Sequence, residues 1–161
     1  MNFLYIEPTM DEISHYKKII KKQGILVCRD QLDIYTIVET VDHFTFGFLH
    51  VSEKAQIGKR KINSFEEKFN LNGFVLCLYN PILPDELSIE LICATKQSKM
   101  GKTMMEIVEE KAREMNIKKL TLNCIANEKL RAWYESIGFV FVKTINLRND
   151  IPKVYYMIKM V

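Results

Sequence analysis

The stretch Leu87–Met115, LSIELICATKQSKMGKTMMEIVEEKAREM, decides the fold of this chain of 161 residues. It begins with an apolar run rich in β-favouring residues, Leu87–Cys93, and ends with the spacing of an amphipathic helix, Gly101–Met115. The polar loop between them contains Lys96, Lys99, Gly101 and Lys102. Strand, basic loop and helix N-terminus often hold a phosphorylated ligand, because free backbone N–H groups and the positive end of the helix dipole point at the anion. The stretch therefore predicts a phosphate ligand.

The composition predicts one globular domain that covers residues 1–161. Apolar residues make up 48% and charged residues 27%, which is ordinary for a soluble protein. The net charge of +3, with no aromatic-interleaved basic patch, gives no signal for direct nucleic-acid binding. No apolar run has the length of a membrane span, and the start MNFLYIEP is unlike a signal peptide. We expect a cytoplasmic monomer or homodimer without a membrane partner.

The four cysteines predict neither a metal site nor a disulfide framework. Cys28, Cys77, Cys93 and Cys124 are widely spaced, and no pair has CxxC spacing. A structural zinc site needs closely spaced ligands, so no metal is expected. Three of the four lie in apolar runs, where cysteine packs as a small hydrophobe. A reducing compartment fits this pattern.

The first half of the chain predicts a strand, a helix and three further strands. After a strand at Asn2–Ile6, Thr9 and Glu12 fit a capping box, and the following helix is expected to end at Gly24. Its apolar face is Met10, Ile13, Tyr16 and Ile20. The β-rich runs Ile34–Val41 and Phe44–Val51 are expected to form a hairpin that turns at Asp42-His43. Residues Ser52–Gly73 are expected to form a long connection or lid before a strand at Phe74–Tyr79.

The second half predicts alternating strands and helices. The helix Gly101–Met115 places Met104, Met105, Val108, Ala112 and Met115 on one apolar face. Asn116 is expected to end it, and a strand at Lys118–Cys124 follows. Asn127 is expected to open a second helix that stops at Gly138, before strands at Phe139–Ile145 and Val154–Val161. This order predicts an α/β (α+β) fold with a central mixed, mostly antiparallel sheet flanked by helices.

The runs IELICATKQSKMGKTMMEIVEEKA and KKLTLNCIANEKLRAWYESIGFV resemble the acyl-CoA-binding half of the GNAT superfamily of N-acetyltransferases. In that family a strand leads into a loop (Arg/Gln)-x-x-Gly-x-(Gly/Ala) and then a helix; here the loop is residues 96–101. A second motif, asparagine, tyrosine seven residues later, then glycine and phenylalanine, matches Asn127, Tyr134, Gly138 and Phe139. The resemblance covers about residues 87–142 and implies an acyl-CoA N-acyltransferase-like fold.

Two positions of the loop depart from the family pattern. Lys96 stands where arginine or glutamine is usual, and Lys99 stands where the first glycine is usual. Without that glycine, close approach of the backbone to a ligand is harder. Lysines can offset this as point charges, but they lack the bidentate fork of arginine. The path of the loop is therefore the main question that the sequence raises.

The resemblance implies an acetyl-CoA cosubstrate and a role for each matching residue. The strand backbone around Ile89 and Leu91 would pair with the pantetheine arm, and one of its N–H groups would polarise the thioester carbonyl. Asn127 would contact the cofactor, and Tyr134 would protonate the departing thiolate. The pyrophosphate would be held at Lys96, Ser98, Lys99, Met100, Gly101, Lys102 and Thr103. The alternative for Tyr134 is a core aromatic one turn from Leu130.

The general base is predicted to be Glu90. An alkylamine has a pKa near 10.4, so only about one molecule in a thousand is unprotonated near neutral pH. A carboxylate, acting directly or through water, can recover roughly 10²–10⁴-fold in rate. Glu90 is an acid inside the apolar strand, where burial would favour its taking up a proton. The alternative is an edge or ion-paired strand residue.

Two other classes of function compete with an acetyltransferase. Gly101-Lys102-Thr103 ends like a nucleotide-binding P-loop, but the pattern requires glycine at Lys96, and no later strand ends in an aspartate for magnesium. An acyl-CoA-binding module that has lost catalysis is the stronger alternative, because of the altered loop and the unproven base. The amine acceptor could be a small molecule, a peptide or a protein, and the sequence does not choose among them.

Overall fold

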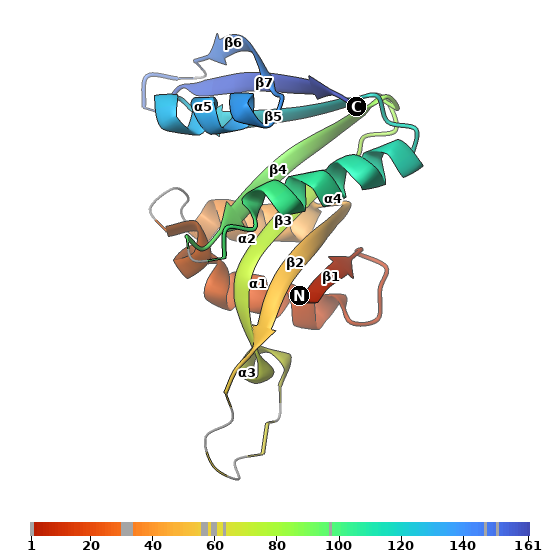
Figure 1. The fold of residues 1–161 in the computed structure, drawn as a ribbon, viewed down its shortest axis with the longest axis vertical. Helices are drawn as coiled ribbons and strands as arrows, with labels where there is room; N and C mark the ends of the chain where they lie inside the picture. Colours follow the sequence, from red (N-terminus) through yellow and green to blue (C-terminus); the bar gives the residue numbers. More distant parts are fainter. Residues whose placement is uncertain are drawn as a thin grey trace. The chain divides into compact units, whose positions relative to one another are not determined.

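The computed structural model describes residues 2–29, 34–55, 58, 61–62, 64–96, 98–146, 148–150 and 152–161 (Figure 1). Its elements are β1 (Asn2–Ile6), α1 (Ile13–Cys28), α2 (Ile34–His43), β2 (Phe46–Glu53), α3 (Phe65–Lys68), β3 (Phe69–Leu78), β4 (Glu86–Ala94), α4 (Gly101–Glu114), β5 (Lys119–Ile125), α5 (Glu128–Ser136), β6 (Val140–Ile145) and β7 (Val154–Met160). The described strands form one seven-stranded sheet in the order β1-β2-β3-β4-β5-β7-β6. The pair β4–β5 is parallel, whereas β1–β2, β2–β3, β5–β7 and β6–β7 are antiparallel. The predicted fold class, a mixed and mostly antiparallel sheet flanked by helices, is confirmed.

The chain divides into two compact units, which are described in turn. The first unit contains Met1–Leu78 and Leu91–Met105, and the second contains Tyr79–Glu90 and Glu106–Val161. Strand β4 and helix α4 each contribute residues to both units.

In the first unit, helices lie on both faces of the β2–β3 ladder. Phe74 of β3 is fully buried beside Gly24 of α1, at 3.5 Å from the position of an added Cβ. The preceding residue, Gly73, faces the other way, because a Cβ there would lie 3.0 Å from the Met104 side chain of α4. Helices α1 and α2 therefore cover one face and the start of α4 covers the other.

The predicted boundaries of α1 are wrong at both ends. The helix begins at Ile13 without a side-chain cap, and Glu12 instead accepts a hydrogen bond from the Tyr16 hydroxyl at 2.8 Å. It also continues past Gly24 to Cys28. Gly24 lies on the buried face, where the missing side chain admits close packing against Ile37. Tertiary packing here outweighs the helix penalty of glycine, about 1 kcal/mol.

The prediction of a strand at Ile34–Val41 is also wrong, because these residues form α2. Its β-branched residues favour a strand locally, but Ile37, Val41 and Phe44 recur at helical spacing and are all buried. The Phe44 N–H donates to the Thr40 carbonyl at 3.1 Å, as in a helical turn. The expected hairpin at Asp42-His43 does not form.

The connection predicted at Ser52–Gly73 is shorter than expected. Strand β2 runs to Glu53 and β3 already begins at Phe69, so both strands extend into the predicted loop. The short helix α3 precedes β3, and its N-cap Ser64 accepts from the Glu67 N–H at 3.3 Å. Positions 56–57, 59–60 and 63 of the predicted lid lie outside the described residues.

A disulfide joins Cys28, the last residue of α1, to Cys93 of β4, which corrects the expectation of unlinked cysteines. Spacing could not reveal it, since the two residues are 65 positions apart and meet only through the fold. Both are buried in the core of the first unit. Cys77 and Cys124 are buried and not part of a disulfide.

Replacing both bonded cysteines should lower the stability of the fold. For the double variant Cys28→Ala/Cys93→Ala we expect a free energy of unfolding about 4 kcal/mol lower, since a cross-link over 65 residues restricts the unfolded chain. Urea unfolding with and without reductant measures the change. Reductant should lower the midpoint of the wild type and leave that of the double variant unchanged; equal midpoints for the oxidised wild type and the double variant would contradict the prediction.

His50 makes the stability of the first unit depend on pH. It is 8% exposed on β2, and its Nδ1 is the one buried side-chain nitrogen or oxygen in the described residues without a hydrogen-bond partner. Burial lowers the pKa of His50 below 6.5. The unfolded chain therefore takes up a proton before the folded one, and stability falls as pH drops through about 6.5.

We expect His50→Phe to weaken this pH dependence between pH 7 and 5, because phenylalanine keeps an aromatic ring beside Phe3 and does not titrate. Urea unfolding at several pH values measures it. The matched control is His15→Gln, which replaces an exposed histidine. If His50→Phe and the control lose the same stability over this range, His50 is not the source.

The second unit contains the β5–β7–β6 ladder with α5 and most of α4. Its buried residues include Leu87, Val108, Leu120, Leu122 and Met157. Predicted helix ends are confirmed here: Asn116 has φ 59° after α4, and Gly138 has φ 100° after α5. Both are left-handed conformations, which asparagine and glycine adopt more readily than other residues.

Candidate functional site

Strand β4 pairs with β5 through its first residues. Parallel pairing is described from Glu86↔Lys119 to Ile89↔Leu122, whereas β4 continues to Ala94 and β5 to Ile125. The side chains of Ile89 and Leu91 are 4% and 5% exposed, so these residues can offer a ligand only their backbone.

Glu90 is exposed, which corrects the expectation that the apolar strand buries it. Side chains alternate along a strand, so Ile89 and Leu91 face the core while Glu90 points away from it. The Ser88 hydroxyl donates to Glu90 Oε1 at 2.7 Å and restricts its orientation. Its role as the base remains a prediction, and the exposed position favours action through water over direct contact with a buried amine.

The loop after β4 is fixed at its start by two sets of hydrogen bonds. The Thr95 N–H donates to the Asn72 carbonyl of β3 at 2.8 Å. The Thr95 carbonyl in turn accepts from the N–H and the hydroxyl of Ser98, at 3.1 and 2.9 Å. These contacts were not foreseen, although threonine and serine three residues apart are typical of a tight turn. Residue 97 lies outside the described residues.

Lys99 has φ 50°, in the left-handed region that favours glycine. It occupies the position of the first glycine in the family pattern, so the loop keeps a glycine-type conformation although the residue is lysine. This conformation costs a non-glycine residue about 1–2 kcal/mol. Lys96, Lys99 and Lys102, in and next to this turn in sequence, have exposed side chains.

Helix α4 begins directly after this turn. The Met100 side chain is buried, and its carbonyl accepts from the Met104 N–H at 2.9 Å. The N–H groups of Gly101, Lys102 and Thr103 precede this first helical bond, so the helix itself supplies no acceptor for them. A left-handed turn followed by unbonded N–H groups at a positive helix end suits a pyrophosphate.

In the second unit, Asn127 caps α5 as the sequence predicts. Its Oδ1 accepts from the Leu130 N–H at 3.1 Å, and its carbonyl accepts from the Arg131 N–H at 2.9 Å. The N-cap role explains asparagine at this position without a ligand. Cofactor contact by Asn127 therefore stays a prediction.

Tyr134 of α5 is 6% exposed and lies in an aromatic cluster. Its ring makes edge-on contacts with Trp133 at 4.9 Å and Phe139 at 5.7 Å between centroids. Burial raises the pKa of Tyr134, with a smaller contribution from Cys124 nearby. The hydroxyl therefore keeps its proton at neutral pH, as a hydrogen-bond donor to a thiolate requires. Burial also raises the pKa of the Cys124 thiol, which argues for packing and against a nucleophile.

The predicted site residues fall in both units. Ile89, Glu90, Asn127 and Tyr134 belong to the second unit, and Leu91 and the loop residues from Lys96 to Thr103 belong to the first. A hollow of about 330 Å³ in the first unit is lined by Glu12, His15, Ile62, Ser64, Phe65 and Lys68. It contains none of the predicted site residues.

Two other types of site are absent from the described part of the chain. No three His, Cys, Asp or Glu side chains in it are grouped to hold a metal ion. None of its helices is both long and apolar enough to cross a membrane.

Comparisons with known proteins agree with this geometry. Residues 88–160 match the family model described as an acetyltransferase (GNAT) domain. No curated protein matches the chain. Among solved structures, the IAA acetyltransferase from Bacillus cereus has 15% identity and a TM-score of 0.62, with 99% of each chain covered.

Two further solved structures share the fold. The NatC complex bound to Gag peptide and CoA has 14% identity and a TM-score of 0.64, covering 100% of this chain and 99% of that one. The aminoglycoside 6'-N-acetyltransferase from Enterococcus faecium has 10% identity and a TM-score of 0.67, covering 99% and 97%. The matched residues include β4 from Ser88 onward, the loop, α4 and the Asn127–Phe139 motif. Residues 88–160 therefore match a GNAT acetyltransferase domain, and the chain has the fold of these solved acetyltransferase structures.

Proposed function

We propose that the protein is an N-acetyltransferase that transfers an acetyl group from acetyl-CoA to a primary amine by direct attack. The observation that carries the proposal is Lys99, which adopts a glycine-type conformation at the glycine position of the family loop. Retaining this conformation in spite of its cost suggests that the loop still serves an anion. We further propose that both units act as one acetyltransferase-like domain, since β4 and α4 belong to both.

Binding of acetyl-CoA would rely mainly on backbone groups. The N–H groups from Ser98 to Thr103 would hold the pyrophosphate, with the exposed lysines as point charges around it. The β4 backbone around Ile89 and Leu91 would pair with the pantetheine arm as a short added strand. Asn127 would add a polar contact to the cofactor.

The chemical step requires proton transfers at both ends of the reaction. The neutral amine attacks the thioester carbon, a β4 N–H stabilises the oxyanion, and the C–S bond then breaks. Tyr134 would donate a hydrogen bond to the leaving sulfur and pass it a proton. The attacking nitrogen loses one proton, through water, to Glu90. Return of that proton to Tyr134 by way of solvent balances the cycle.

A primary amine is the expected acceptor class. The solved structures of this fold include proteins named for an aminoglycoside substrate and one bound to a peptide, so small molecules and polypeptides both fit the fold. Thiol release from acetyl-CoA across a panel of amines, with mass spectrometry of the products, tests the proposal. Tight acetyl-CoA binding with no thiol release from any amine would overturn it.

Tight acetyl-CoA binding without thiol release would favour an acyl-CoA-binding module without catalysis. The exposed position of Glu90 is the observation that supports this alternative, because no buried base is then present at β4. The nucleotide-binding alternative predicts a higher melting temperature with magnesium-ATP, whereas the proposal predicts a rise with acetyl-CoA only.

A cytoplasmic location and a monomeric or homodimeric state complete the proposal. The Cys28–Cys93 disulfide argues against a cytosolic location, because the cytosol usually keeps thiols reduced. Counting the reactive thiols of protein taken directly from cells would test the location, because a reducing compartment should leave Cys28 and Cys93 unlinked.

A further inference from the structure

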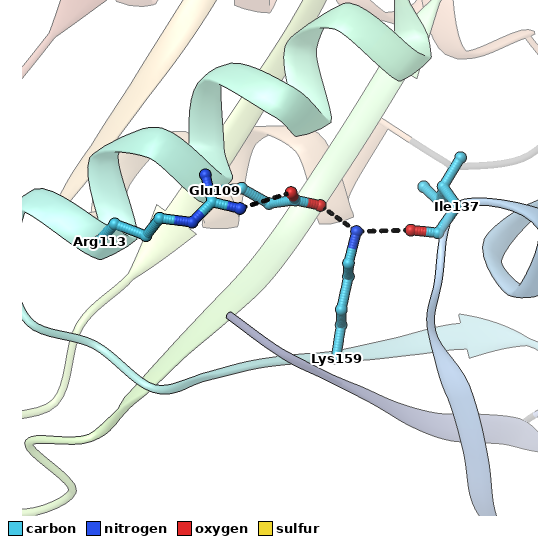
Figure 2. Close-up of polar contacts among 4 residues, drawn as sticks. All are labelled: Glu109, Arg113, Ile137 and Lys159. Atoms are coloured by element: carbon cyan, nitrogen blue, oxygen red, sulfur yellow. Dashed lines mark hydrogen bonds and ion pairs between the residues drawn. The ribbon is translucent and has the colours of Figure 1, made fainter.

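We infer that Lys159 of β7 is a positioning residue, which fixes the turn after α5 and thereby the side chain of Tyr134. The inference rests on the proposed function for the role of Tyr134. Lys159 is far from the family motifs in sequence, and its interactions are drawn in Figure 2.

Lys159 joins three elements of the second unit. Its Nζ donates to the Ile137 carbonyl at 2.6 Å and forms an ion pair with Glu109 of α4. Glu109 is 9% exposed and also contacts Arg113 Nη2 at 3.4 Å (Figure 2). The ammonium therefore lies between a buried carboxylate and a backbone carbonyl.

The bonded carbonyl belongs to the turn that ends the Tyr134 helix. Ile137 is the C-cap of α5, where carbonyl groups have no helical partner. The Tyr134 carbonyl accepts from the Ile137 N–H at 3.2 Å and the Phe139 N–H at 3.0 Å. Two consecutive hydrogen bonds thus connect the Lys159 ammonium to the backbone of Tyr134, and Phe139 also contacts the Tyr134 ring.

Gly138 gives this lysine its space. A Cβ at Gly138 would lie 2.9 Å from Lys159 Cε and 3.2 Å from Nζ, both too close. The residue also has φ 100°, which favours glycine, and any larger residue would displace the end of the Lys159 side chain. The glycine of the Asn127–Phe139 motif therefore has a specific neighbour, the Lys159 stem.

Loss of Lys159 would leave two polar groups without their cation. Arg113 still reaches Glu109, but the Ile137 carbonyl loses its donor, and an unsatisfied carbonyl favours rearrangement of the turn. A shift of about 1 Å in a catalytic group can cost about 10²-fold in rate. The expected consequence is a lower kcat with unchanged cofactor binding.

The test uses Lys159→Met, which keeps the unbranched stem, and Lys159→Arg, which keeps a cation. The control is Lys153→Met, at an exposed lysine just before β7. We expect Lys159→Met to lower kcat about tenfold or more, with less than a twofold change in the Kd of acetyl-CoA. Lys159→Arg should recover most of the rate, and Lys153→Met should match the wild type.

A second measurement does not need activity. Trp133 is the one tryptophan of the chain and contacts the Tyr134 ring, so its fluorescence and near-ultraviolet circular dichroism report on this cluster. Lys159→Met should change both signals while Lys153→Met leaves them as in the wild type. If no amine supports thiol release even in the wild type, the proposed function fails, and the Trp133 signals still test the placement of the turn.

If Lys159→Met does not fold, Glu109→Gln provides a second variant that tests the same contact. Glutamine keeps an acceptor for Lys159, so we expect an intact Lys159–Ile137 bond and a smaller loss of kcat than in any folded Lys159 variant that lacks the cation. Wild-type kcat and wild-type Trp133 signals in folded Lys159→Met would overturn the inference. A greater loss of kcat in Glu109→Gln than in Lys159→Met would also overturn it. If Lys159→Met does not fold, the overturning result is a tenfold loss of kcat in Glu109→Gln with unchanged Trp133 signals.

Discussion

Tyr134→Phe is expected to lower kcat by about 100-fold or more, while the Kd of acetyl-CoA stays within twofold of the wild type. A positioned acid contributes roughly 10²–10⁴-fold, and phenylalanine removes only the hydroxyl. The ring keeps its contacts with Trp133 and Phe139, so the aromatic cluster and the fold should persist. Thiol release under saturating acetyl-CoA and titration of the cofactor measure the two quantities.

The control for this substitution is Tyr156→Phe, which removes a hydroxyl from β7 in the same unit. The pH dependence gives a second check. Because burial raises the pKa of Tyr134 above 10, its proton is retained well above neutral pH, and the wild-type rate should show no alkaline loss from this group up to about pH 10. Full activity of Tyr134→Phe would contradict the catalytic assignment and support a purely structural tyrosine.

Sequence patterns predict the second half of the chain much better than the first. Asn116, Asn127 and Gly138 end or begin helices through their own backbone and capping preferences, and these boundaries hold within one or two residues. The run Ile34–Val41 has no such local marker. Its β-branched residues satisfy both a strand and a helix pattern, and burial against the first unit's core selects the helix.

The candidate site shows the same division between local and distant causes. The order of strand β4, basic loop and helix α4, and the cap of α5 at Asn127, follow from short motifs. The exposed Glu90, the Cys28–Cys93 disulfide and the Lys159–Glu109 pair depend on strand orientation or on contacts across many residues. A single sequence carries no local signal for such contacts, although Gly138 does indicate that something lies close to it.

Gly101→Pro should weaken acetyl-CoA binding by about tenfold or more while leaving α4 intact. Gly101 is the first residue of the helix, a position that proline tolerates because its φ suits the helix and its N–H has no helical partner. The substitution therefore removes one donor from the proposed pyrophosphate site, and a hydrogen bond to a charged group contributes about 1.5–3 kcal/mol. Isothermal titration measures the affinity, and far-ultraviolet circular dichroism confirms the helix.

An unchanged Kd for acetyl-CoA in a folded Gly101→Pro variant would contradict this prediction. It would mean that the N-terminus of α4 does not hold the cofactor. A loss of helix signal would show that proline does not fit the first turn, and Gly101→Ala serves as the matched control that keeps the N–H. The Kd of Gly101→Ala for acetyl-CoA should lie within a few-fold of the wild-type value.

A series at Lys99 separates the charge of the loop from its backbone conformation. Lys99→Glu should weaken acetyl-CoA binding most, because a carboxylate repels the pyrophosphate. Lys99→Ala and Lys99→Gly both remove the cation, but only glycine relieves the strain of the left-handed conformation. That strain costs a non-glycine residue about 1–2 kcal/mol. Glycine instead loses more backbone entropy on folding, at a cost of about 0.5–1 kcal/mol. The Lys99→Gly variant should therefore be at least as stable as the wild type, and it should bind acetyl-CoA more tightly than Lys99→Ala. If Lys99→Ala and Lys99→Gly bind equally, the backbone conformation at this position does not affect binding, and the comparison of both with the wild type measures the effect of the charge.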